Sequence, residues 1–175
     1  MRGRPFTIYI DEWIRSGNIG PVRPGMKTNE IKKIFPKPDS IDFMSEGIFI
    51  WSYNHLEFHL INDELQLIWC DWLDTLKSPR KKQFKLDRGI LNSRTDIVGI
   101  TRILKLWNKT FDQFGFYSGD QLEAIIYNFH PLTLHFEGEE NQDIRNWKLI
   151  AIGSTSDNFI QTYSSPHYKK LDFDF

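Results

Sequence analysis

The feature that most constrains the fold of this chain is the stretch IFIWSYNHLEFHLINDELQLIWCDW, residues 48–72. Its β-branched and aromatic residues are interrupted by two turn-forming pairs, Tyr53-Asn54 and Asn62-Asp63. Short runs of such residues between turn signals are typical of antiparallel strands. The stretch therefore predicts a three-stranded antiparallel meander.

The predicted meander has two different surfaces, because side chains alternate between the faces of a strand. One surface is expected to be apolar and to need a helix against it, with Leu56, Phe58, Leu60, Leu65, Leu67 and Trp69. The other is mixed, with His55, Glu57, His59, Gln66, Ile68 and Cys70. We expect the mixed surface to be the exposed one.

A short helix is predicted before the meander, in the sequence GPVRPGMKTNEIKKIFPKPDS, residues 20–40. Thr28 is a good N-cap and Glu30 suits the first turn, where the helix dipole favours a negative charge. The apolar stripe is Ile31, Ile34 and Phe35, and prolines follow it. The glycines do not have the spacing of a phosphate-binding loop, so we interpret them as turn residues.

A second helix is predicted to begin after Ser93 or Thr95 and to end at Gly115. Apolar residues recur every three or four positions along it, at Ile97, Ile100, Leu104, Trp107, Phe111 and Phe114. Three further strands are expected at residues 122–129, 132–138 and 146–153. This half therefore repeats the order of the first, a capped helix followed by a meander.

The predicted fold class is α+β, with two helix-plus-antiparallel-meander units and the helices on one face of the sheet. We expect a first unit at residues 1–76, a basic linker at 77–88, a second unit at 89–153 and a C-terminal tail at 154–175. Arg80-Lys81-Lys82 gives the linker its charge. In the tail, alternate apolar residues (Leu171, Phe173 and Phe175) predict an extended segment that docks on the chain's own sheet or helix. The alternative is strand addition to a partner or to a second copy in a homodimer.

The segment from Ile19-Gly20-Pro21 through Pro24-Gly25-Met26, followed by Glu30-Ile31, Phe35 and Pro38-Asp39, resembles a known signature. The signature is G-M-[ST]-x-x-E-[VI]-x-x-x-[LF]-G-x-P, of the β-lactamase-inhibitor-like superfamily. That superfamily also includes small lipoproteins of bacterial outer-membrane assembly and a cytoplasmic bacterial branch, to which this chain is most similar. The resemblance implies a helix-loop-helix on a small antiparallel sheet, present twice in the inhibitor branch, where the concave sheet face grips an enzyme.

Composition and charge narrow the range of partners. With 22 Lys+Arg against 23 Asp+Glu the net charge is −1, so the sequence offers no electrostatic argument for nucleic acid or an anionic membrane. Aromatic residues make up 15% of the chain, which together with the small net charge favours a protein partner or a small ligand. One cysteine excludes an internal disulfide, and the basic N-terminus lacks a signal-peptide cleavage pattern, so we expect a cytoplasmic protein.

We expect no catalytic residues, no metal and no cofactor, because no catalytic signature occurs and the carboxylate pairs fall in polar loops. His55, His59, Cys70 and His135 could together bind zinc, but residues four apart on a strand are roughly 13 Å apart. The predicted function is a non-enzymatic protein-binding module, of the inhibitor or toxin-immunity kind. The alternative is a small-ligand or metal-binding protein that uses the face bearing His and Cys. The partner-binding residues expected on the exposed face and its edge are Trp51, Tyr53, His55, Glu57, His59, Gln66, Ile68, Thr133 and His135.

Overall fold

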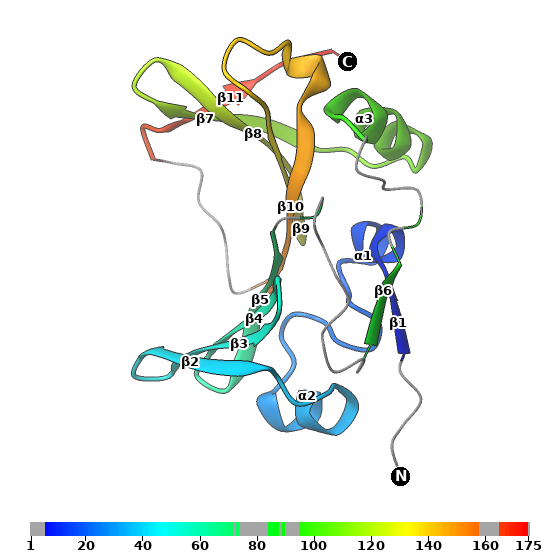
Figure 1. Cartoon of the computed structure of the whole chain (residues 1–175), viewed down its shortest axis with the longest axis vertical. Helices are drawn as coiled ribbons and strands as arrows, with labels where there is room; N and C mark the ends of the chain where they lie inside the picture. Colours follow the sequence, from blue (N-terminus) through cyan, green and yellow to red (C-terminus); the bar gives the residue numbers. More distant parts are fainter. Residues whose placement is uncertain are drawn as a thin grey trace.

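The computed structural model describes residues 6–71, 73, 84–87, 89, 95–157 and 165–174. Within these residues the chain is α+β, with three α-helices, a nine-stranded antiparallel sheet and a two-stranded parallel sheet (Figure 1). The helices are α1 Ile10–Ser16, α2 Thr28–Ile34 and α3 Ile97–Leu106, with a short 3-10 helix at Ile144–Asn146. The strands are β1 Phe6–Tyr9, β2 Ser40–Ser45, β3 Ile48–Tyr53, β4 Leu56–Ile61, β5 Glu64–Cys70, β6 Phe84–Asp87, β7 Asp112–Ser118, β8 Gln121–Phe129, β9 Leu132–Glu137, β10 Lys148–Thr155 and β11 Tyr168–Leu171.

The large sheet consists of two meanders joined side by side. Its strand order is β11-β7-β8-β9-β10-β5-β4-β3-β2, so β2–β5 form one meander and β7–β10 the other. They join where β5 pairs antiparallel with β10, with Cys70 opposite Ile152. In Figure 1 α1 and α3 lie to the right of the central strands β5, β9 and β10, α2 lies below them, and both ends of the sheet turn to the left. The sheet is therefore strongly curved.

The N-terminal segment forms structure that the sequence patterns did not predict. β1 pairs in parallel with β6, Phe6 opposite Phe84, and α1 follows it directly. Trp13 of α1 is fully buried, and its Nε1–H donates to Ser154 Oγ on β10 at 3.0 Å. Part of the range expected as a linker is thus the strand β6, while residues 77–83, with the basic run, lie outside the described residues.

Helix α2 forms where it was predicted, although its N-cap is Lys27 and Thr28 is its first helical residue. The Glu30 carboxylate accepts a hydrogen bond from the Lys27 backbone N–H at 2.9 Å, which satisfies a donor that the first turn leaves free. Phe35 follows the helix and is buried, with ring centroids 5.0 Å from Tyr53 and 4.9 Å from Phe58. These contacts anchor α2 to the first meander.

Helix α3 is shorter than the predicted helix. Asp96 caps it by accepting from the Gly99 N–H at 2.8 Å, but the helix ends at Leu106 because Asn108 is left-handed, with φ 53°. Phe114 and Gly115 lie in β7, so Gly115 does not stop a helix. The three- and four-residue spacing of Phe111 and Phe114 is coincidental, and the extension of the helix past Leu106 was wrong.

The C-terminal segment contains β11, which pairs antiparallel with β7 of the same chain, Tyr168 opposite Phe116. Leu171 and Phe173 are partly buried against the core, and Phe175 lies outside the described residues. The apolar side chains of this segment are therefore used within the chain's own sheet. None of the helices in the described ranges is both long and apolar enough to cross a membrane.

Candidate binding surface on the open face of the sheet

A β-bulge in β5 determines which side chains reach the exposed side of the sheet. His59 pairs with Leu67 and Leu60 pairs with Leu65, so Gln66 is an extra residue on β5 that has no paired residue on β4. From Leu67 onward the faces of β5 are therefore exchanged relative to strict alternation. Trp69 joins His59 on one face, whereas Ile68 lies opposite Phe58 in the core.

The bulge overturns one of the predicted partner-binding residues. Ile68 has no exposed surface, and Cys70 beside it is 1% exposed on the same core face. Burial raises the pKa of the Cys70 thiol well above its ordinary value, so the thiol is held in its neutral form. Ile68 cannot contact a partner in this register.

Trp51 and Tyr53 were also expected at the edge of the exposed face, and the structure places both in the core. They lie opposite Phe58 and Leu56 and are 4% and 1% exposed. The Tyr53 hydroxyl donates to the Pro36 carbonyl oxygen at 2.9 Å, and burial raises the pKa of Tyr53. They belong to the core because strand β3 continues through both residues, so neither is in an edge loop.

The remaining predicted residues lie on or beside the other surface, which we call the open face and define by Glu57, His59, Leu67, Trp69, Thr133 and His135. Register places Glu57, Trp69, Gly153 and Thr133 in one row across four strands. His59 Nε2 lies 2.9 Å from a Glu57 carboxylate oxygen. These side chains come from both meanders, so the open face is continuous across their junction.

Two predicted residues lie at the margins of the open face. His55 precedes β4, and its Nδ1 is 3.5 Å from the Asp71 carboxylate. Gln66 is the bulge residue, and its amide nitrogen donates to Glu64 at 3.1 Å while its amide oxygen accepts from the Ser156 hydroxyl. Both ends of the Gln66 amide are therefore hydrogen-bonded within the chain.

Thr133 is only 3% exposed, so this predicted partner-binding residue is buried and is not available to a partner. Among the described residues, Thr133 Oγ1 and His135 Nε2 are buried side-chain atoms without a hydrogen-bond partner. The Trp69 ring meets the His135 ring edge-on at 4.9 Å between centroids. Burial lowers the pKa of His135 to about 4, because a charged imidazole would be desolvated there. His135 is therefore neutral near pH 7.

Gly153 allows Trp69 and Thr133 to approach each other across β10. A Cβ at position 153 would lie 2.8 Å from Thr133 Oγ1 and 3.1 Å from Trp69 Cε3. We expect Gly153→Ala to lower the free energy of unfolding by about 1–3 kcal/mol, because the added methyl overpacks this contact. Urea unfolding measures the change, and Gly99→Ala in α3, where the nearest atom is at 3.3 Å, is the control. Equal effects of the two substitutions would contradict the packing described for Trp69.

Apolar side chains are exposed on the β2–β3 hairpin, at one edge of the large sheet. All six residues of β2 are exposed, and β2 has a strand neighbour on one side only. The large apolar residues exposed here are Ile41, Phe43, Met44 and Phe49, and the Phe43 and Phe49 rings are 5.5 Å apart. The sequence patterns did not predict β2. Its alternation of Ile41, Asp42 and Phe43 is a weak signal that could have identified it.

The set of residues considered for zinc is not brought together. Cys70 is on the core face, opposite to the face of His59 and His135. Among the described residues no group of three His, Cys, Asp or Glu side chains has the arrangement needed to hold a metal ion. The geometry therefore gives no support to the alternative in which a His/Cys face binds metal.

Comparison with known proteins supplies no family for this architecture. The chain matches no protein-family model, no curated protein and no solved structure.

Proposed function

We propose that this chain is a non-enzymatic protein-binding module whose interface is the exposed apolar surface of the β2–β3 hairpin, where Ile41, Phe43 and Phe49 lie on the side of the sheet opposite to the open face. The observation that carries the proposal is the exposure of Ile41, Phe43, Met44 and Phe49 together, at 53%, 65%, 62% and 38%. Contiguous apolar surface on a water-facing hairpin is unfavourable unless a partner covers it, and such patches mark protein contacts.

The arrangement of the strands supports a second part of the proposal, that the chain is a tandem repeat like the β-lactamase-inhibitor branch. Helix α2 precedes the meander β2–β5, and α3 precedes the meander β7–β10. The two meanders meet through their last strands, which is the arrangement expected if each half is one copy of the same unit. The proposed role is then that of a cytoplasmic bacterial inhibitor or immunity-like protein.

Photo-crosslinking tests the proposed interface. A benzoylphenylalanine in place of Phe43 is expected to form a discrete covalent adduct with one protein in lysate of the native host. The same residue in place of Leu106, which is 78% exposed on α3, is the control for general surface reactivity. We expect no adduct from position 106.

A second substitution makes the result specific. Phe49→Asp places a charge beside position 43 on the same apolar surface. Combined with the crosslinker at position 43, it is expected to reduce the adduct because the partner covers that surface. Circular dichroism establishes that each variant is folded. The absence of an adduct at position 43, or the same adduct from position 106, would contradict a partner interface at the hairpin.

A further inference from the structure

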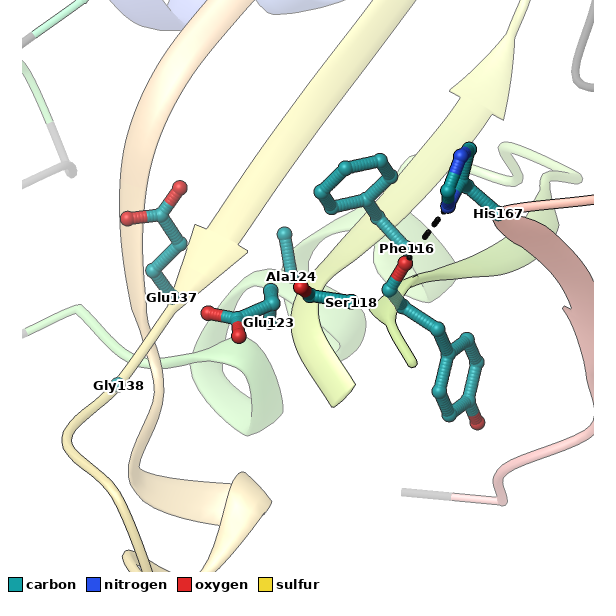
Figure 2. A pocket seen from close by; sticks show the side chains of 8 residues that line it. Phe116, Ser118, Glu123, Ala124, Glu137, Gly138 and His167 are labelled. Atoms are coloured by element: carbon teal, nitrogen blue, oxygen red, sulfur yellow. Dashed lines mark hydrogen bonds between the residues drawn. The ribbon is translucent and has the colours of Figure 1, made fainter. Parts of the chain in front are cut away.

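A cavity of about 480 Å³ lies at the end of the sheet formed by β7 and β8, at the far end of the strand order from the β2–β3 hairpin (Figure 2). It is lined by Phe116, Tyr117, Ser118, Glu123, Ala124, Glu137, Gly138 and His167. Its volume is within the range of small-molecule sites in proteins. None of the residues predicted from the sequence to bind a partner lines it.

Two carboxylates give the cavity its charge. The pKa of the Glu137 carboxyl is raised, mainly by burial and to a smaller extent by the negative charge of Glu123. Among the described residues neither carboxylate has an ion-pair or hydrogen-bond partner. Lys148 is opposite Glu137 in register, but its ammonium lies 3.9 Å from Asp96 Oδ2. The two carboxylates therefore repel each other without a cation between them.

Apolar groups form the wall beside the carboxylates. Figure 2 shows Glu123 and Glu137 on one side of Ala124 and the Phe116 ring on the other. The Phe116 ring also packs against Tyr168, at 5.3 Å between centroids, which fixes its position. Tyr117 already holds a cation of this chain, since Lys169 Nζ lies 4.5 Å from its ring centroid. A face of carboxylates beside a face of hydrocarbon suits a ligand that has a charged end and an alkyl chain.

We propose that this cavity binds an organic cation, with an alkylammonium or guanidinium group against Glu123 and Glu137 and its carbon chain against Phe116 and Ala124. The cation would offset the repulsion between the carboxylates and donate hydrogen bonds to both of them. The same chemistry is found in free diamines and in the lysine or arginine side chain of a protein. The site goes beyond the proposed interface and does not depend on it.

The two alanines of the chain make the test direct. Ala124 lines the cavity and Ala151 lies on β10 outside it, so protein labelled with 13C in alanine methyl groups gives one reporter and one internal control. Titration with putrescine and agmatine is expected to shift the Ala124 methyl signal and leave the Ala151 signal in place. Nα-acetyl-lysine methylamide and Nα-acetyl-arginine methylamide present the same groups as the side chains of a protein. Tighter binding of these two compounds would indicate a protein side chain as the natural ligand, and tighter binding of putrescine or agmatine would indicate a free amine.

Isosteric variants separate this site from general attraction between charges. Glu123→Gln and Glu137→Gln are each expected to weaken binding about tenfold. Glu46→Gln, in the exposed turn after β2, removes the same charge elsewhere and is expected to change nothing. The position of the Ala151 signal verifies that the sheet of each variant is intact.

Three results would overturn the proposal. The first is an Ala124 signal that none of the four cations shifts. The second is an equal shift with magnesium chloride or with uncharged 1,4-butanediol. The third is unchanged binding in the double variant Glu123→Gln/Glu137→Gln. Each of these outcomes is independent of whether the β2–β3 hairpin binds a protein.

Discussion

Trp13→Ala is expected to lower the free energy of unfolding by about 3–5 kcal/mol, the largest effect of any substitution considered for this chain. The indole is fully buried, so its removal leaves a large cavity between α1 and the sheet. The substitution also leaves the Ser154 hydroxyl on β10, itself fully buried, without the donor at 3.0 Å. Urea denaturation followed by circular dichroism measures the change.

Tyr9→Ala is the matched control, because Tyr9 lies in the same segment and its side chain is 47% exposed. We expect it to cost less than about 1 kcal/mol. Trp13→Phe should lie between the two, since it keeps most of the apolar contact and loses the N–H. If Trp13→Ala were as mild as Tyr9→Ala, then α1 would not be docked on β10 as described.

Stability is expected to fall by about 3 kcal/mol between pH 7 and pH 4 through His135 alone. Burial lowers the pKa of His135 to about 4 in the folded protein, from an ordinary value of 6.5. In the unfolded chain the His135 imidazole therefore takes up a proton as the pH falls below about 6.5. In the folded protein the same imidazole remains neutral until about pH 4. Proton uptake by the unfolded state alone favours unfolding, so the contribution of His135 to stability is lost between about pH 6.5 and pH 4. Below that range both states are protonated and this contribution changes no further.

The contribution of His135 is isolated by comparison with His135→Leu. Carboxylates also titrate in this range, so the measured quantity is the difference between wild type and variant at each pH. We expect that difference to move by about 3 kcal/mol in favour of the variant as the pH falls from 7 to 4. An NMR titration of the wild-type imidazole should give a midpoint near 4. A midpoint near 6.5, with a constant difference in stability, would show that His135 is not desolvated.

The strands and helix that could be predicted from the sequence are those with complete local signals. The runs that became β3, β4 and β5 are bounded by Asn54 and by Asn62-Asp63, which adopt the left-handed conformation that such turns require. Helix α2 has its acidic first turn and its prolines adjacent in sequence. In each case the deciding residues lie within one short window, so pattern and structure agree.

The elements that could not be predicted depend on distant contacts or on a single residue. β1 becomes a strand by pairing with β6, so no window of the sequence contains both partners. The bulge at Gln66 has no glycine or proline to mark it, yet it decides that Ile68 is core and Trp69 is on the open face. One inserted residue is enough to move a predicted site residue to the opposite side of the sheet. The chemistry of the Glu123 and Glu137 cavity also arises only when β8 and β9 are paired.

The junction of β5 with β10 has a consequence for how the chain is made. During synthesis the first meander emerges complete, and residues 25–27 already pair with Glu64 and Leu65 at the start of the β5 edge. The rest of that edge, Leu67 to Cys70, has no partner strand until residue 155 has left the ribosome. For that period the nascent chain presents an unpaired strand next to apolar side chains, the template on which another nascent chain can add. Synthesis of β10 therefore competes in time with the pairing of β5 to another nascent chain. Slow codons between β5 and β10 would lengthen the interval in which the chain is open to aggregation.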